Sequence, residues 1–175
     1  MAFIRLKKIK KGSGNIYMYG YLVENSWRKR PKSGKRGSRQ KVKKYLGRVY
    51  EFEERGETIF YEYVKTPDYQ EYLKNRSFRE IVQDLVNWEI YRHHIEGFKA
   101  TADSVRKEGS SCVIKINEGF MCSHTLQKLL GFTATGEERE DGIELAQCFI
   151  EAGIDIPEEL FVGIFGKITR HLDEE

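Results

Sequence analysis

Long apolar runs and paired cysteines are both missing from this sequence. No stretch approaches the roughly 18 apolar residues that a membrane-spanning helix requires, and the first eight residues lack the apolar core of a signal peptide. The three cysteines, Cys112, Cys122 and Cys148, are odd in number and widely spaced, which argues against a disulfide framework. These absences favour a cytoplasmic protein, and 175 residues suffice for one domain or two small ones.

Acidic residues are almost absent from the first fifty positions. Residues 1–50 contain 16 Lys or Arg and a single acid, Glu24, which gives a net charge of +15. Residues 51–175 contain 14 basic and 26 acidic residues, which gives −12, so the whole chain carries only +3. Such a separation of charge along one chain predicts a polyanionic partner for the basic half.

Aromatic and β-branched residues predict strands in the first 65 positions. Segments 3–9, 16–27 and 42–50 have this composition, and 58–64 is predicted as a fourth strand. The segment between the second and third strands consists of basic and small polar residues with almost nothing to bury. We therefore predict a basic antiparallel β module over residues 1–66, with a flexible basic loop at 28–41.

Helical spacing of apolar residues dominates from residue 77 onward. Ser77 and Glu80 form a capping-box pattern, and an apolar face follows to about residue 94. A weak helix at 100–108 and a short strand at 112–116 are predicted next. Further helices are expected at 123–130 with Ser123 as its cap, at 137–152, and after Pro157. The predicted fold class is α+β: a small antiparallel sheet followed by a mainly helical, acidic domain over 77–175.

The basic loop and the strand after it are the candidate nucleic-acid site. Arg and Lys neutralise phosphates and release counterions, which gives affinity without sequence readout. An aromatic side chain beside such a loop can stack on an unpaired base. The candidate residues are Trp27, Arg28, Lys29, Arg30, Lys32, Lys35, Arg36, Arg39, Lys41, Lys43, Lys44 and Arg48.

Three tyrosines alternate along the second predicted strand. Tyr17, Tyr19 and Tyr21 share one face of that strand because successive side chains point to opposite faces. Stacking on bases is one use for such rings, and packing in the core of the sheet against a helix is the other. We expect most of them to pack in the core, and Trp27 to be the exposed stacking residue.

Three segments of the N-terminal part resemble the N-terminal module of some transposases. They are Phe3-Ile4-Arg5, the sequence YGYLVEN at 19–25 and the sequence KVKKYLG at 41–47. In that family an aromatic strand ending near YLVE leads through a basic loop to a KYLG strand. The resemblance covers only about the first 50 residues. The large catalytic domain of that family has no counterpart here, so the resemblance implies contact with nucleic acid and not transposition.

Taken together, the sequence predicts a non-catalytic protein that binds nucleic-acid phosphates, with RNA slightly preferred over DNA and with no cofactor. One alternative is a protein–protein adaptor that uses the acidic helices. Another is a metal-dependent nuclease with carboxylates such as Glu118, Glu140 and Asp141 near a metal. A structural metal is not predicted, because the cysteines and histidines contain no Cys-x-x-Cys pair.

Overall fold

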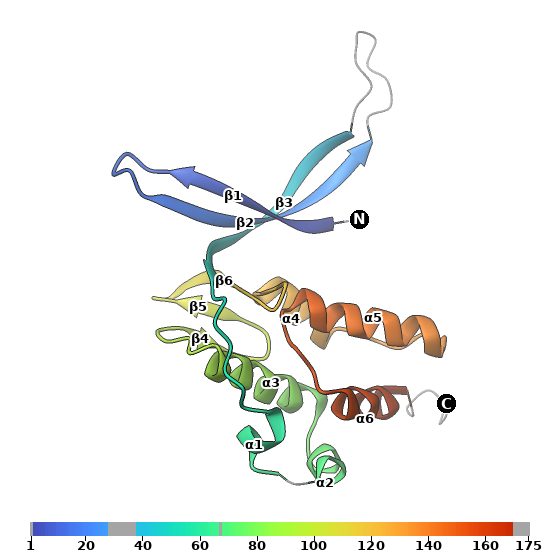
Figure 1. Ribbon diagram of the computed structural model, residues 1–175. Helices are drawn as coiled ribbons and strands as arrows, with labels where there is room; N and C mark the ends of the chain where they lie inside the picture. The colour runs from blue at the N-terminus through green and yellow to red at the C-terminus, as the bar shows by residue number, and fades with distance from the viewer. Residues whose placement is uncertain (1, 28–37, 67, 170–175) are drawn as a thin grey trace.

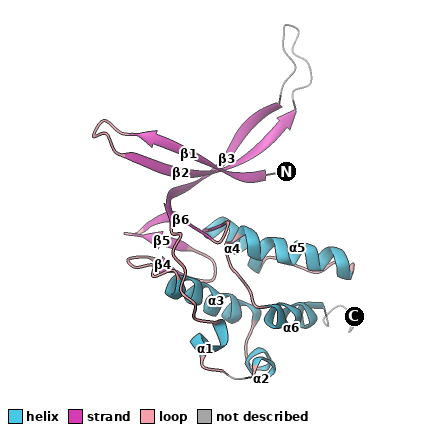
Figure 2. Cartoon of the chain, in the orientation of Figure 1, coloured by secondary structure: helices cyan, strands magenta, loops and turns pink. Residues whose placement is uncertain are grey.

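The computed structural model describes residues 2–27, 38–66 and 68–169. Within these residues seven strands form one sheet in the order β1-β2-β3-β6-β5-β4, and β7 pairs with β6. The helices gather around the half of the sheet that contains β4–β6 (Figures 1 and 2). The predicted α+β class is confirmed. None of the described helices is long and apolar enough to cross a membrane.

The first three strands project away from the helices, as Figure 1 shows. They are β1 (Ala2–Lys10), β2 (Ile16–Trp27) and β3 (Ser38–Glu51), and β2 pairs antiparallel with both neighbours. These strands and the β1–β2 turn are called the β1–β3 extension below. The three strands predicted at 3–9, 16–27 and 42–50 are confirmed. Most of the predicted basic loop, at 28–37, lies outside the described residues.

One strand from the part predicted as helical joins this extension to the rest of the sheet. β6 (Ser110–Ile116) runs parallel to β3, with Arg48 opposite Cys112 and Tyr50 opposite Ile114. It also pairs with β5 (Val105–Lys107) and β7 (Gly119–Met121), and β4 (Lys99–Ala100) pairs with β5. The strand predicted at 112–116 is confirmed. The N-terminal strands and the later part of the chain therefore share one sheet.

Two sequence-based assignments are wrong, and tertiary packing explains both. The helix predicted at 100–108 is replaced by the short strands β4 and β5, because Val105 is fully buried as part of the core. The strand predicted at 58–64 is the short helix α1 (Phe60–Val64). Phe60 is fully buried there, and its ring centroid lies 5.5 Å from that of Trp88 and 5.7 Å from that of Tyr72.

The remaining helices follow the sequence signals closely. α3 (Phe78–Arg92) begins at Ser77, whose capping box with Glu80 is present as predicted. α4 (Ser123–Leu130), α5 (Glu138–Glu151) and α6 (Glu158–Thr169) match the three later predictions, although Cys122 rather than Ser123 is the N-cap of α4. A further short helix, α2 (Tyr69–Lys74), has Asp68 as its N-cap. All of these helices except α4 have an acidic residue in the first turn, near the positive end of the helix.

Two hydrophobic cores lie on opposite faces of the sheet. The main core packs β6 side chains such as Ile114 against the helices, including Leu85 of α3 and Phe149 of α5. The smaller core contains Leu46, Val49, Val113 and Cys122, with partly buried residues that include Ile4, Leu6, Met18 and Leu22 packed against it. Those four residues lie on the face of β1 and β2 that does not carry the tyrosines. That face of the extension therefore packs against the rest of the protein.

Candidate nucleic-acid interface

The tyrosines of β2 lie on the face of the extension that no helix covers. Tyr17, Tyr19 and Tyr21 are half-buried and belong to neither core, so the prediction that most of them pack in the core is wrong. The reason lies on β1, where Arg5 is directly opposite Tyr21 and Lys7 is directly opposite Tyr19. A helix covering the tyrosines would bury these two charges without partners, at a large cost in free energy.

Tyr45 of β3 extends this aromatic face and is its most exposed member, with 54% of its surface accessible. It lies opposite Tyr21, with ring centroids 5.3 Å apart, and 6.2 Å from the ring of Tyr19. A β-bulge follows at this point, because the pairing shifts between Gly20 and Tyr21. The extra residue, Leu46, packs into the smaller core. Tyr45 therefore lies on the aromatic face while Leu46 points to the opposite face.

Five of the predicted nucleic-acid-binding residues lie exposed on β3. They are Arg39, Lys41, Lys43, Lys44 and Arg48. Arg28, Lys29, Arg30, Lys32, Lys35 and Arg36 lie outside the described residues, as does the side chain of Trp27. The structure adds five cations of β1 and its turn to the same unit: Arg5, Lys7, Lys8, Lys10 and Lys11.

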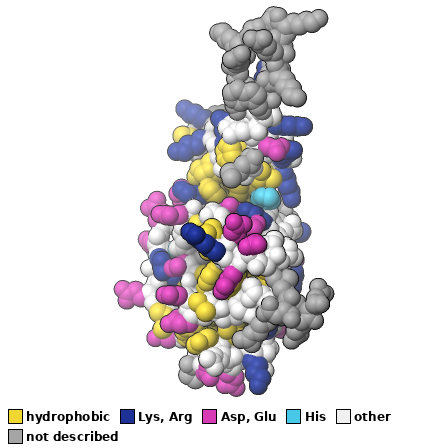
Figure 3. All heavy atoms as spheres, turned by 90° about the vertical axis from the view of Figure 1, so that its right-hand side faces the viewer, with side chains coloured by type: hydrophobic (Ala, Val, Ile, Leu, Met, Phe, Trp, Pro, Cys, Tyr) yellow, Lys and Arg dark blue, Asp and Glu magenta, His cyan; other side chains and the backbone are white. Residues whose placement is uncertain are grey.

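The cations of the extension differ from those of the helical part in how they are paired. Within the described residues, Lys43 alone among the ten cations of residues 2–48 has a carboxylate partner, Glu24, at 2.6 Å. Its hydrogen bond and charge hold the pKa of Glu24 below the usual value. Among the described residues after 50, six of the thirteen Lys and Arg side chains have a carboxylate partner. Examples are Arg76 with Asp84 and Lys128 with Glu151, each at 2.7 Å. Figure 3 shows Lys and Arg side chains around the upper part and carboxylates over the lower part.

Cation–π contacts link the aromatic face to the edge of the main core. The guanidinium of Arg48 lies 4.3 Å from the ring centroid of Tyr17 and 4.8 Å from that of Tyr50. The ammonium of Lys107, on β5, lies 4.7 Å from Tyr50 and 4.5 Å from Phe98. Sequence reasoning missed Lys107 because only the pairing of β3 with β6 brings β5 close to the extension. The candidate interface therefore includes Lys107, a cation far from the extension in sequence.

A separate groove on the opposite face of the extension is mainly apolar. It has a volume of about 680 Å³ between β1–β2 and the helices α4 and α5. Its lining includes Ile4, Leu22, Phe120 and Ile150, and Figure 3 shows hydrophobic side chains gathered on this side of the molecule. His124 also lines it, and burial, aided by the charges of nearby lysines, lowers the pKa of that imidazole. This groove differs in chemistry from the basic, aromatic face.

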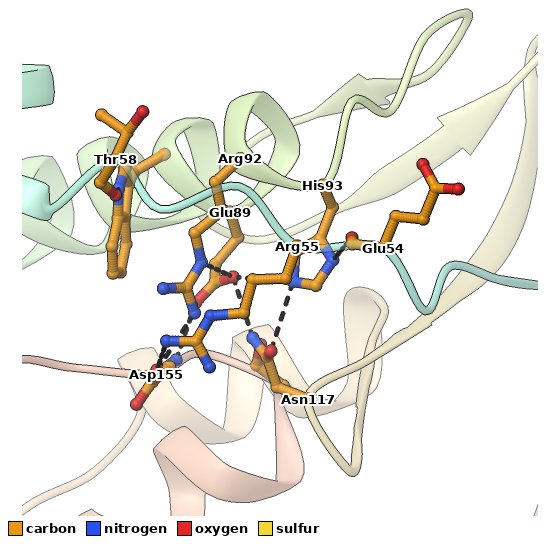
Figure 4. A network of polar contacts seen from close by, with 10 residues as sticks. Glu54, Arg55, Thr58, Glu89, Arg92, His93, Asn117 and Asp155 are labelled. Atoms are coloured by element: carbon orange, nitrogen blue, oxygen red, sulfur yellow. Dashed lines mark hydrogen bonds and ion pairs between the residues drawn. The ribbon is translucent and has the colours of Figure 1, made fainter.

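A buried polar network centres on Glu89 of α3 (Figure 4). The fully buried carboxylate of Glu89 accepts bonds from Arg92 Nε at 2.8 Å, from Asn117 Nδ2 at 2.8 Å and from the Asp155 backbone N–H at 2.8 Å. Arg92 Nη2 adds a second bond to Glu89 at 3.0 Å and one to Asp155 at 3.2 Å. His93 Nδ1–H donates to the carbonyl of Glu54 at 2.7 Å.

This network joins four segments that are distant in sequence. They are the stretch before α1, the end of α3, the β6–β7 turn and the α5–α6 connection. Arg55 adds an exposed ion pair to Asp155 at 2.6 Å. Because the charged groups already bond to one another, the arrangement fits a structural link better than a catalytic site. The sequence holds no motif for it, apart from the Glu89–Arg92 spacing along one face of a helix.

Glu118 lies apart from the other two carboxylates considered for a nuclease, Glu140 and Asp141, which share the first turn of α5. Asp141, at the start of α5, accepts bonds from the backbone and hydroxyl of Thr135 and from Gly136. Burial raises the pKa of Asp141, but these hydrogen bonds outweigh it and hold the pKa below its usual value. Glu118 lies near Ile150, at the other end of α5. Nine residues of helix separate those ends by about 13 Å.

The cysteines are buried free thiols. Burial raises the pKa of Cys112 to about 11, and it also raises the pKa of Cys148. In the parts of the chain that the structure describes, no group of three or more His, Cys, Asp or Glu side chains is placed to hold a metal ion.

Comparison with protein-family models, with curated proteins and with solved structures finds no match to this chain.

Proposed function

We propose that this protein binds nucleic acid without catalysis, contacting phosphates through the cations of the β1–β3 extension. The observation that carries the proposal is the lack of carboxylate partners for nine of the ten described cations of that unit. Unpaired, exposed Lys and Arg keep a positive potential that attracts a polyanion. Contact with phosphates does not require a helix or strand that enters a groove and recognises bases. A protruding antiparallel sheet can present its cations to a nucleic acid along its whole length.

RNA is the preferred partner in this proposal. The Arg-rich segment 28–41 combines Gly and Ser with cations, a composition that suits irregular RNA surfaces. The resemblance of the first 50 residues to a transposase module supports contact with nucleic acid in general. The buried free thiols fit a reducing compartment, and we propose the cytoplasm as the place of action.

The wild-type protein tests this proposal directly. We expect binding to single-stranded RNA, duplex RNA and duplex DNA at low salt, with affinity that falls steeply as salt rises because condensed counterions are released on binding. Fluorescence anisotropy with labelled strands at two or more salt concentrations measures this. Absence of binding to all three at low salt contradicts the proposal. Capture of a protein partner that survives nuclease treatment favours the adaptor instead.

A further inference from the structure

We propose that a hollow beside Tyr45 receives an unpaired nucleobase, so that the extension binds single-stranded nucleic acid in preference to duplex. This inference rests on the proposed phosphate contact and adds the kind of strand. The hollow has a volume of about 390 Å³ and lies where β3 passes β6. Its lining includes Tyr45, Gly47, Arg48, Tyr50, Lys107 and Ser110.

Tyr45 is the ring of this face best placed to stack on a base. Arg48 already lies over the rings of Tyr17 and Tyr50, and Lys11 also lies over Tyr17. Tyr45 contacts only tilted tyrosine rings, and more than half of its surface is accessible. Neighbouring rings limit its rotation, which lowers the conformational entropy lost when a base stacks on it.

The hollow joins this ring to two positive charges. Arg48 and Lys107 both line it, and their contacts with aromatic rings hold them at its wall. The lining contains no Asp or Glu in the part of the chain that the structure describes. A base in the hollow would carry its flanking phosphates toward these cations. Proteins that bind single-stranded nucleic acids combine aromatic rings that stack on bases with cations that neutralise the phosphates.

The same geometry disfavours a duplex as the occupant. In a duplex the bases are stacked on one another, and their faces are closed to a side chain approaching from outside. A duplex can meet the cations of the extension but cannot fill the hollow beside Tyr45. Stacking should therefore add affinity only for a strand with unpaired bases.

Substitution of Tyr45 separates stacking from phosphate contact. We expect Tyr45→Ala to weaken binding of an unstructured single-stranded RNA by roughly 5- to 100-fold, the range found for stacked bases. Tyr45→Phe keeps the ring and should stay within about twofold of the wild type. The matched control is Tyr91→Ala, which removes a tyrosine that is 55% exposed on α3. Anisotropy at one fixed low salt concentration, with circular dichroism to confirm folding, gives the affinities.

The same strand annealed to its complement completes the test. Binding of the duplex should change less than about twofold in each of the three variants, and a single-stranded DNA should follow the RNA, because every base has a π-face. Equal losses for single strand and duplex in Tyr45→Ala, or equal losses in Tyr45→Ala and Tyr45→Phe, overturn the base-binding hollow. If salt-dependent binding persists and Tyr45→Ala has no effect, this inference fails while the proposed function stands. Failure of the wild type to bind any strand removes both.

Discussion

Glu89→Gln is expected to lower the free energy of unfolding by about 3–5 kcal/mol, the cost of breaking a buried ion pair from one side. The carboxylate of Glu89 is fully buried and pairs with Arg92, which is itself only 3% exposed. Replacing it with an amide leaves the guanidinium without its main counter-charge, 3.9 Å from the ring centroid of Trp88. Two further donors, from Asn117 and the Asp155 backbone, also lose a charged acceptor.

Urea unfolding followed by circular dichroism measures this change. The matched control is Glu151→Gln, which breaks the exposed pair between Glu151 and Lys128. Exposed pairs contribute at most about 1 kcal/mol, so this control should unfold close to the wild type. A loss below about 1 kcal/mol for Glu89→Gln would show that the buried network does not hold the four segments together.

Gly47→Ala is expected to cost at least about 2 kcal/mol, because it combines backbone strain with a steric clash. Gly47 has a φ of +115°, a conformation that side-chain-bearing residues rarely adopt. A Cβ at this position would lie 2.2 Å from the carbonyl oxygen of Ser111 and 3.0 Å from Cys112 Cα. Both are backbone atoms of β6, so relief of the clash requires β3 and β6 to separate where the extension joins the rest of the sheet.

Gly109→Ala isolates the strain from the clash. Gly109 has a φ of +79°, but a Cβ there would meet no atom within 4 Å. This control should cost only the roughly 1–2 kcal/mol of a left-handed residue. Thermal or urea unfolding of both variants gives the comparison. Equal losses for the two would mean that the close approach of β3 to β6 contributes nothing to stability.

The parts of the fold that the sequence predicts are those with local causes. The capping box of Ser77 and Glu80 and the apolar face that follows it determine α3 within one segment. By contrast, α1 is helical because Phe60 fits between Trp88 and Tyr72, and nothing near residue 60 indicates this. Likewise β4 and β5 depend on pairing with β6. Such tertiary contacts override local propensity.

The candidate site divides in the same way. The charge of the extension follows from composition alone, and five of the predicted residues are found exposed on β3. The prediction that the tyrosines pack in the core is wrong, although the sequence contains one signal against it. In a hairpin that turns at 11–15, Lys7 falls opposite Tyr19, so the tyrosine face already contains charge. The sequence does not predict the hollow beside Tyr45, because the hollow depends on the bulge in β3 and on the parallel pairing of β3 with β6, which brings Lys107 near.

The salt dependence of binding after charge removal tests the central claim most directly. A variant with Lys7, Lys10, Lys41 and Lys44 changed to Gln loses four exposed cations of the extension, and none of them lines the hollow. The control variant changes Lys74, Lys99, Arg106 and Arg139 to Gln, four exposed cations outside the extension.

For single-stranded RNA, the phosphate-contact account predicts that the first variant flattens the slope of log K against log salt by about 3, since each neutralised phosphate contributes about 0.7. The control should keep the wild-type slope, and equal slopes in all three proteins would contradict phosphate binding by the β1–β3 extension.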